Sequence, residues 1–454
     1  MVALQLAGPF LPFDTRPAVS AAAALVFATG FPLMSGSFRI AALLFLALGS
    51  ALLAFGRSPL SVWTAAIASM TNIVCIVAVM QTFSIPIRLG DYNEAIRSWL
   101  GRRFKGRRSL FLFTTFATHL LTSFLNLGSI PILVSLLRDA LERRVPQHRR
   151  FFAAAATRGY VLAALWSPGA VNLFLVVQAT GLSWSAVALP GFLLALFGMV
   201  LSFLLESRKG GILDPAPAAT TEVTVGPEEA GAAPPPVSGS KSRAWHVVLV
   251  AAAFVLAVVL LEGLGIGTSS GRILMAGLMT ASLWLISLAR LPGLPSILRS
   301  YWTEGLLKTA DIAPFFVAMG LFSGALENSG AMGFVGPVIE EASVFLGAAT
   351  VVPIGLLIIL GSLIGLHPFI TIVLFGKMLM HASLPVPTLT VALSLAVGGA
   401  AAYMVSPFAG VIMTVSKLIG AKASDVAIRW NWRFGLSFYA TGMVFAFAWG
   451  AVFG

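Results

Sequence analysis

The sequence predicts an all-α polytopic membrane protein built from two inverted repeats, each with five transmembrane helices and one re-entrant hairpin. Three observations lead to this prediction. The 454 residues are 58% hydrophobic and only 10% charged, with a mean hydropathy of +0.94, whereas soluble domains carry about 25% charged residues. Apolar stretches of about 18–25 residues, long enough to cross a bilayer, recur along the chain. The two halves of the chain also share a pattern at a constant spacing.

The net charge of +12 does not indicate a nucleic-acid-binding protein. Lys and Arg lie mostly in short loops between apolar stretches, as in membrane proteins whose basic loops stay cytoplasmic. No soluble face remains to carry nucleic acid. Cys75 is the only cysteine, which excludes an intrachain disulfide and a cysteine metal site. The apolar stretch at 17–34 lacks a basic n-region and a clear cleavage site, so we expect a retained span.

A segment at 206–244 divides the membrane part into two halves. It is rich in Pro, Ala, Gly and Ser, which predicts a flexible soluble linker. The first repeat then occupies 1–205 and the second 245–454. Apolar helices are expected at 18–35, 39–56, 61–85, 153–180 and 185–205 in the first repeat, and at 246–265, 272–290, 306–326, 389–418 and 434–453 in the second.

Counterparts in the two halves lie 239 residues apart. Ser-Pro pairs are uncommon within apolar runs, and one offset serves three separated places, so an internal duplication is preferred over chance similarity. The matched positions are Ser123-Phe-Leu-Asn126-Leu-Gly128-Ser129 with Ser362-Leu-Ile-Gly365-Leu-His367-Pro368, Ser167-Pro168 with Ser406-Pro407, and Asn72 with Asp311.

The apolar stretch at 109–137 is predicted to be a re-entrant hairpin. Basic clusters flank it on both sides, and a simple span would place them on opposite sides of the membrane, against the positive-inside pattern. Its tip would lie at 126–131, beside protein or a cavity. The equivalent stretch at 344–381 follows Glu340 and Glu341 and has few basic neighbours, so it is expected to enter from outside.

Five spans and one hairpin per half give an odd number of crossings, so the second repeat must be inverted. Both termini are then expected outside the inner (cytoplasmic) membrane, with the 206–244 linker in the cytoplasm. Inverted repeats with interrupted helices are typical of secondary transporters. No catalytic or nucleotide-binding motif is present in the sequence, so we expect no enzyme and no cofactor beyond a coupling ion.

The interrupted elements are the predicted binding site. A helix broken within the membrane leaves N–H groups at one end and C=O groups at the other, which attract anions and cations, respectively. Each half has two such breaks, the hairpin tip and the Ser-Pro pair, where proline removes a backbone donor. Asn172 lies one turn after Pro168, and Thr414 occupies the similar region of the second half.

Ionisable residues inside apolar spans are rare and therefore informative. Asp311, the counterpart of Asn72, fits either a proton or cation site or a solvated interfacial carboxylate. His367 fits either a proton carrier or a hydrogen-bonded core residue. Asn126 and Ser129 fit either a ligand site or simple caps of helix ends. No set of residues predicts a resident metal.

This order of elements resembles the ion transporter superfamily, which includes divalent anion/sodium symporters, citrate carriers, arsenite-type permeases and the large membrane subunits of tripartite periplasmic transporters. The resemblance covers nearly the whole chain. It implies a homodimer with a scaffold part and an elevator-like moving part. It also implies that substrate and coupling ion are held by Ser123, Asn126, Gly128, Ser129, Ser167, Pro168 and Asn172 in the first half and by Ser362, His367, Pro368, Thr371, Ser406, Pro407 and Thr414 in the second.

The leading hypothesis is a secondary active transporter that moves a small anion across the inner membrane, coupled to sodium or protons. An organic carboxylate is the expected anion. The bilayer and the anion are its expected partners. One alternative is a cation/proton antiporter or metalloid efflux permease, in which Asp311 would titrate. Another is the large membrane subunit of a multi-component transporter.

Overall fold

The computed structural model describes residues 1–34, 36–90, 92, 106–214, 240–288, 294–305, 307, 310, 312–330 and 332–454. Every regular element in this part of the chain is helical, as expected where lipid offers the backbone no hydrogen-bond partner. Ten of these helical stretches are long and apolar enough to cross a membrane. The predicted fold class, an all-α polytopic membrane protein, is therefore confirmed.

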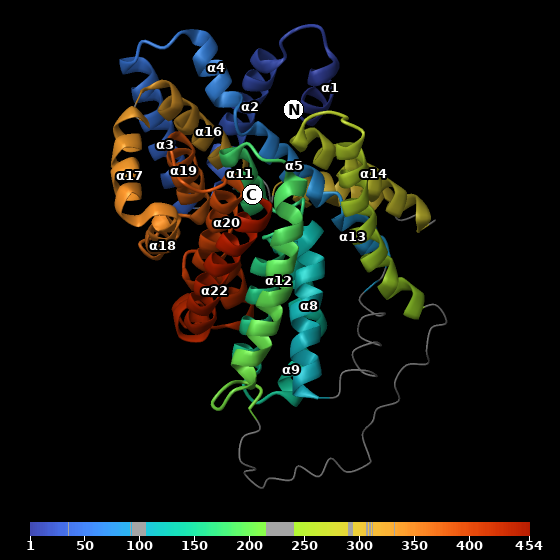
Figure 1. Ribbon diagram of the computed structural model, residues 1–454. Helices are drawn as coiled ribbons and strands as arrows, with labels where there is room; N and C mark the ends of the chain where they lie inside the picture. Colours follow the sequence, from blue (N-terminus) through green and yellow to red (C-terminus); the bar gives the residue numbers. More distant parts are fainter. Residues whose placement is uncertain are drawn as a thin grey trace, which may run out of the picture.

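The first half begins with the short helix α1 and ends with the long helix α12 (Figure 1). Its elements are α1 (Val2–Ala7), η1 (Gly8–Phe10), α2 (Arg16–Gly30), η2 (Phe31–Leu33), α3 (Gly36–Phe55), α4 (Leu60–Ala68), α5 (Thr71–Gln81), α6 (Ser84–Leu89), α8 (Arg107–Leu125), η3 (Asn126–Gly128), α9 (Ser129–Arg144), α10 (His148–Ala163), α11 (Val171–Thr180) and α12 (Trp184–Ser207).

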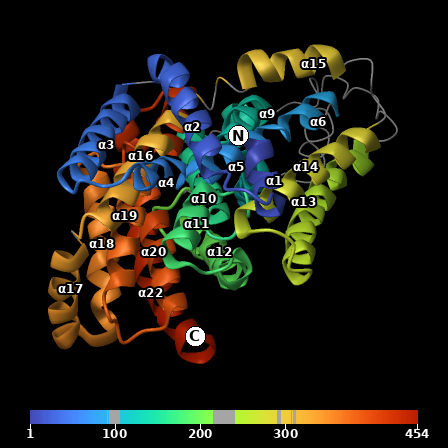
Figure 2. The same ribbon diagram turned by 90° about the horizontal axis from the view of Figure 1, so that it is seen from above.

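The second half places α13 and α14 on the opposite side of the molecule from α17 and α18 (Figure 2). Its elements are α13 (Ser240–Gly263), α14 (Ser269–Ser287), α15 (Leu294–Ser300), η5 (Tyr301–Gly305), α16 (Ala313–Asn328), α17 (Met332–Leu346), η7 (Gly347–Thr350), α18 (Val351–Leu363), α19 (Pro368–His381), α20 (Thr388–Val405), α21 (Gly410–Ile419), η8 (Asp425–Arg429) and α22 (Trp430–Phe453).

Two elements differ from the sequence prediction. The expected span at 61–85 is divided into the three helices α4, α5 and α6. Between α4 and α5, the Ser69 hydroxyl donates to Gly320 O (3.1 Å), and Ser69 O accepts a bond from Gln178 (2.9 Å). The second hairpin was expected to start at 344, but 344–350 belong to α17 and η7. Gly347 has a φ of 55° there, which ends α17 before α18 begins.

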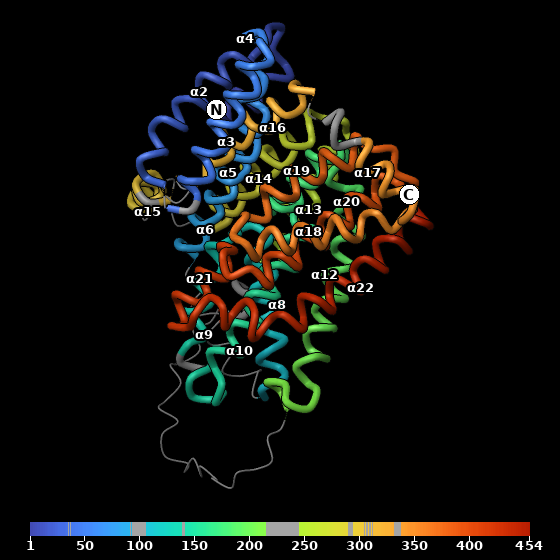
Figure 3. Tube along the Cα trace, turned by 90° about the vertical axis from the view of Figure 1, so that its left-hand side faces the viewer, coloured from blue at the N-terminus to red at the C-terminus, as the bar shows by residue number. Residues whose placement is uncertain are grey.

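Both predicted hairpins are present as pairs of helices. In the first half α8 and α10 run parallel, since the Phe111 ring packs on Phe151 (5.4 Å between centroids) and His119 stacks on Trp166 (5.7 Å). Because α9 joins the end of α8 to the start of α10, it must run back along α8 (Figure 3). The side from which each hairpin enters the membrane stays a prediction.

The second hairpin follows the same geometry. Gly355 of α18 faces Gly398 of α20, and Ser362 bonds to Ser406 further along both helices. These two helices are therefore parallel and in direct contact, and α19 runs back packed against both. The helices that follow the hairpins, α10 and α20, form the centre of the bundle and are buried along almost their whole length. Their Ala and Gly side chains allow the close approach that membrane helices need in order to pack.

Candidate binding site at the two hairpin tips

The two Ser-Pro interruptions are fastened to the two hairpins in the same way. In the first half the Ser167 hydroxyl donates to Ser123 O, and in the second the Ser406 hydroxyl donates to Ser362 O at 2.6 Å. All four residues are predicted site residues, and each bond joins an interrupted helix to the first arm of its hairpin. Each bond also gives a hydrogen-bond donor to a carbonyl near the end of that arm, where the last C=O groups of a helix have no N–H partner within the helix.

Other bonds repeat at the same offset of 239. Gly169 N donates to Ser167 Oγ at 3.3 Å, and Phe408 N donates to Ser406 Oγ at 3.2 Å. The hydroxyls of Ser123 and Ser362 bond back to the carbonyls three residues earlier, each at 2.7 Å. Gly181 and Gly420 end α11 and α21 with φ values of 71° and 64°. The Ser-Pro loops therefore have the same local construction in both halves.

A cavity of about 490 Å³ lies between the two tips. Asn126 and Gly128 line it from the first tip, and His367 lines it from the second. The volume is within the range of small-molecule sites, about 300–1,000 Å³. Most of the lining is apolar or aromatic. Its polar members are Gln81, Ser84, Arg88, Asn126, Tyr160, Ser300, Tyr301, His367 and Tyr403.

The four helices that follow the hairpin tips and the Ser-Pro interruptions begin at this cavity. Gly128 and His367, which line it, are the residues just before α9 and α19. Val171 and Gly410, which also line it, are the first residues of α11 and α21. Because free N–H groups and the positive end of the helix dipole lie at a helix start, these four starts can hold an anion. The helices α5, α8 and α15 end at the lining residues Gln81, Leu125 and Ser300, where carbonyl oxygens can hold a cation.

Asn126 combines an unusual backbone conformation with a positioned amide. Its φ is 52° and its ψ is −132°, a region that non-glycine residues occupy only at a cost of about 1–3 kcal/mol. The Tyr160 hydroxyl donates to Asn126 Oδ1 at 2.5 Å. Since the amide oxygen accepts this bond, the amide nitrogen is the group left to donate to a ligand.

His367 caps α19 and belongs to an aromatic cluster. Its Nδ1 accepts a bond from Phe369 N at 3.3 Å, so a neutral ring carries its proton on Nε2. The rings of Phe38, Phe315, Phe369 and Tyr403 lie 4.4–6.2 Å from the His367 ring. The capping bond supports a structural role, and the Nε2–H group remains as a donor toward a ligand.

Among the buried polar groups that have no hydrogen-bond partner in the described part of the chain, two lie at or beside this cavity. One is the Tyr403 hydroxyl, whose residue lines the cavity at 5% exposure. The other is the whole carboxamide of Asn172, next to Val171 of the lining. Gly399 makes room for it, because a Cβ there would lie 2.9 Å from Asn172 Oδ1. An unpaired buried polar group costs about 1–3 kcal/mol, so both groups are candidates to bind a ligand, an ion or water.

The rim of the cavity carries a positive charge. Arg88 is exposed, and its Nη1 donates to Ser300 Oγ at 2.6 Å. Tyr301 lies beside them and donates its hydroxyl to Ala78 O at 3.1 Å. Sequence reasoning missed Arg88, Tyr160, Tyr301 and Tyr403. The position of Arg88 just after an apolar stretch, where loop charges are expected, gave no signal of a site.

The remaining predicted residues that the structure describes lie outside this lining. Ser129 bonds to Thr122 Oγ1 and to Asn126 O, both at 2.8 Å. Thr371 and Thr414 bond back to carbonyls of their own helices, and Pro168, Pro368 and Pro407 lie at the interruptions. Asn72 Oδ1 accepts a bond from Ile73 N at 2.9 Å on α5, and Asp311 lies outside the described residues.

No group of three or more His, Cys, Asp or Glu in the described part of the chain could hold a metal ion. The acceptors near the tips are backbone carbonyls and amide or hydroxyl oxygens. Hard monovalent cations use such oxygens where helices are unwound in transporters. These acceptors could therefore hold a coupling cation, for which the described lining residues offer no carboxylate.

No family model and no curated protein matches this sequence. Its structure is similar to that of the YdaH transporter of Alcanivorax borkumensis, whose crystal structure is described as having an unusual topology. The TM-score is 0.58 at 14% sequence identity, over 91% of this chain and 98% of that chain. At this identity the likeness concerns the fold alone. The chain thus has a transporter-like membrane fold, and its resemblance to particular families of the ion transporter superfamily stays a prediction.

Proposed function

We propose that this chain is a secondary active transporter that moves a small organic anion across the inner membrane, coupled to sodium or protons. The observation that carries the proposal is the cavity of about 490 Å³ on which four helix starts converge. Helix starts bind anions through free N–H groups without bringing in a buried charge. Arg88 at the rim adds a full positive charge that attracts an anion toward the cavity.

The lining indicates what kind of anion fits. Aromatic and aliphatic side chains make up most of it, including His367, Phe369 and Tyr403 in one cluster. A carboxylate at the helix starts could therefore place an apolar or aromatic body against these rings. The amide of Asn126 and the hydroxyl of Tyr403 are positioned to donate hydrogen bonds to such a ligand.

The two halves support the proposed inverted repeats, 1–205 and 245–454. The matching bonds at the Ser-Pro loops recur at the offset of 239. The repeat-equivalent helices α12 and α22 run in opposite directions, since Gly198 faces Phe438 while Ser202 and Asn431 both bond to Arg158. We propose external termini, a cytoplasmic 206–244 linker and a homodimer with an elevator-like moving part.

The test is transport by the purified protein in liposomes. Uptake of labelled aromatic and aliphatic carboxylates is measured with an inward sodium gradient, with a pH gradient and with neither. We expect gradient-dependent uptake of at least one carboxylate. If no anion accumulates while added cations dissipate a pH gradient, the cation/proton antiporter is favoured instead. If uptake requires a co-purified small membrane subunit, the multi-component alternative is favoured.

Two matched pairs of variants tie that transport to the cavity. Arg88→Gln should lower uptake about tenfold, because a charged hydrogen bond to an anion contributes about 1.5–3 kcal/mol. Arg57→Gln removes an equally exposed charge away from the cavity and should have no effect. Tyr403→Phe should lower uptake, whereas Tyr439→Phe, outside the lining, should not. Equal losses in the control variants would contradict the assignment of this cavity.

A further inference from the structure

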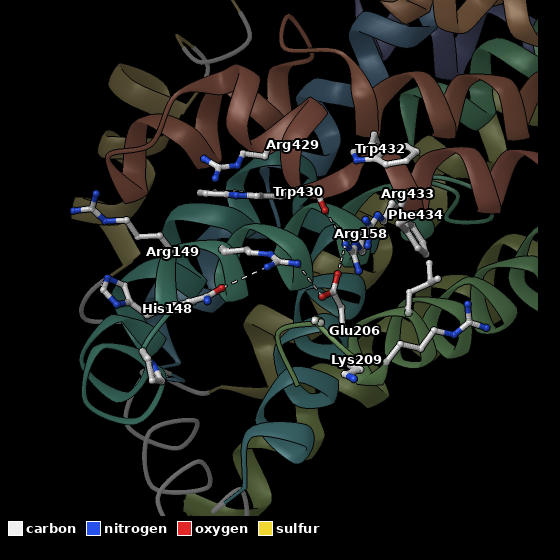
Figure 4. Close-up of a pocket in the computed structure, with 17 residues that line it drawn as sticks. His148, Arg149, Arg158, Glu206, Lys209, Arg429, Trp430, Trp432, Arg433 and Phe434 are labelled. Atoms are coloured by element: carbon white, nitrogen blue, oxygen red, sulfur yellow. Dashed lines mark hydrogen bonds and ion pairs between the residues drawn. The ribbon is translucent and has the colours of Figure 1, made fainter. Parts of the chain in front are cut away.

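A second cavity, of about 760 Å³, lies where α10, α12 and α22 meet, at the end of the bundle that carries the loop at 145–147 and the turn at 208–214 (Figure 4). Seven Lys or Arg residues line it, together with one carboxylate, that of Glu206. Its lining shares no residue with the cavity between the hairpin tips. An inference about this cavity therefore does not rest on the proposed transport function.

The buried floor of this cavity already uses the one carboxylate among its described lining residues. Arg158, 1% exposed, donates from Nη2 to Glu206 Oε1 at 2.7 Å and from Nε to Asn431 Oδ1 at 2.9 Å. Its Nη1 donates to Ser202 Oγ at 3.2 Å, and its guanidinium lies 4.8 Å from the centre of the Phe434 ring. Figure 4 shows this pair between Arg429 and Trp432 on one side and Lys209 on the other.

The second oxygen of Glu206 is also occupied. It accepts a bond from Ile212 N at 3.1 Å and lies 3.7 Å from Arg150 Nη2. Apart from Arg150, the positive charges of the rim therefore have no carboxylate left to pair with in the lining that the structure describes. These rim residues are Arg149, Arg150, Arg208, Lys209, Arg429 and Arg433.

The backbone holds two of these charges in place. Residues 208–214 form a tight turn in which Gly211 N donates to Arg208 O at 2.8 Å and Leu213 N donates to Glu206 O at 3.0 Å. Gly210 has a φ of 80°, and a Cβ on Gly211 would lie 2.2 Å from Glu206 O, so both positions require glycine. The backbone of Arg208 and Lys209, at the start of the 206–244 segment, is thereby held at the rim.

Acidic groups near the cavity neutralise little of its charge. Arg429 Nη1 lies 3.9 Å from Asp425 Oδ1, one helical turn away at the surface, and Asp214 Oδ2 accepts a bond from Gly210 N at 2.7 Å. Arg149 bonds only weakly to Gly420 O at 3.3 Å, and Arg433 lies over the Trp432 ring. A concave site with this excess of positive charge concentrates anions.

We propose that this cavity binds a phosphate group. Arg guanidinium groups match the oxygens of a phosphate in pairs, and several Arg converge here on one cavity. Exposed apolar side chains of Ile428, Trp432 and Leu436 lie beside the basic rim. Trp and Tyr are typical of the membrane–water interface, where basic residues attract anionic lipid headgroups. The phosphate of an anionic phospholipid is therefore the favoured source, and a soluble phosphate is the other.

The experiment uses native mass spectrometry of the full-length protein in detergent, with phosphatidylglycerol or phosphatidylcholine added. We expect retention of phosphatidylglycerol over phosphatidylcholine. The double variant Arg208→Gln/Arg433→Gln removes two rim charges without touching the buried floor and should weaken phosphatidylglycerol binding about tenfold. Arg107→Gln/Arg108→Gln removes two charges from the start of α8, outside the cavity lining, and should leave binding unchanged.

A second arm identifies a soluble source. Inorganic phosphate is added to the delipidated protein and compared with chloride at equal ionic strength, because ionic strength alone screens surface charge. A rise in Tm with phosphate that the Arg208→Gln/Arg433→Gln variant loses would assign the site to soluble phosphate and support the proposal. The proposal is overturned if neither phosphate source binds, or if the Arg107→Gln/Arg108→Gln control loses binding equally.

Discussion

The hairpin and interrupted helix of the first half, 107–180, and those of the second, 351–419, share a backbone but differ in chemistry. Both fasten a Ser-Pro loop to a hairpin arm with the same bonds, and both end the following helix with a left-handed glycine. These features satisfy polar backbone groups that lipid cannot satisfy. The shared part is thus what any interrupted helix needs, whichever ligand the site binds.

The tips differ at one informative position. Asn126 and Gly365 are counterparts at the offset of 239, and both have positive φ, 52° and 103°. The turn itself therefore requires such a conformation, which glycine adopts without strain. The first half instead places an amide there, bonded to Tyr160. A strained residue at a cavity is typical of functional sites, so we infer that Asn126 is retained for its side chain.

The central helices differ in the same manner. Arg158 of α10 holds Glu206 of α12 and Asn431 of α22, whereas its counterpart in α20 is the apolar Val397. At this position one central helix therefore carries a buried charge network, and the other carries an apolar side chain. The following variants test whether these differences, or the shared bonds, determine stability and transport.

The largest effect is expected from Arg158→Ala. The variant leaves the buried Glu206 with only the bond from Ile212 N and the 3.7 Å contact of Arg150. Removal of one partner of a buried ion pair destabilises a protein by about 3–5 kcal/mol. Val397→Ala at the equivalent position only reduces packing and should lower the free energy of unfolding much less. Unfolding of both variants by SDS in mixed micelles measures the difference. Similar losses for the two variants would show that the network is not what distinguishes the halves.

A smaller and symmetric effect is expected from Ser167→Ala and Ser406→Ala. Each variant leaves a buried carbonyl, Ser123 O or Ser362 O, without its side-chain donor, which costs about 1–3 kcal/mol. Because the two loops have the same bonds, the two losses should agree within about 0.5 kcal/mol. The same SDS titration checks this agreement. A large loss in one half alone would contradict the structural equivalence of the loops.

The sequence predicted the parts of this architecture that depend on local residues. Gly and Pro marked the hairpin tips, the paired Ser-Pro dipeptides marked the interruptions, and the offset of 239 connected them. These signals are local because proline and glycine act on their own backbone. Asn126, Gly128 and His367 were identified in this way, and all three line the cavity.

Other features depend on contacts between distant segments. The break between α4 and α5 is stabilised by Gln178 and by Gly320, more than 100 residues away. Arg158 lies within a predicted span, but its pairing with Glu206 appears only when α10 and α12 are packed together. Tyr403 is an ordinary aromatic residue in an apolar run until the fold places its hydroxyl, unpaired, at the cavity.

The tip difference predicts a contrast between two substitutions of Asn126. Asn126→Ala keeps a Cβ in the positive-φ conformation and loses the bond from Tyr160, whereas Asn126→Gly relieves the strain. The glycine variant should be more stable than the alanine variant by about 1 kcal/mol. Both should lose carboxylate uptake in liposomes, since both lack the amide. Full uptake by Asn126→Gly would show that the amide is not a ligand-binding group.

The smallest effect is expected from Ser123→Ala and Ser362→Ala. Both hydroxyls bond back to carbonyls of their own helices at 2.7 Å. Losing this bond should cost little, because alanine favours a helix at least as well as serine does. The free energy of unfolding should stay within about 0.5 kcal/mol of the wild type. The resemblance to known transporters, in contrast, assigns both serines to the substrate site. Uptake by the folded variants decides between the structural role and the substrate-binding role. If uptake is unchanged, these serines only supply the carbonyls that hold the Ser-Pro loops. If uptake is lost without a loss of stability, the hydroxyls are ligand-binding groups.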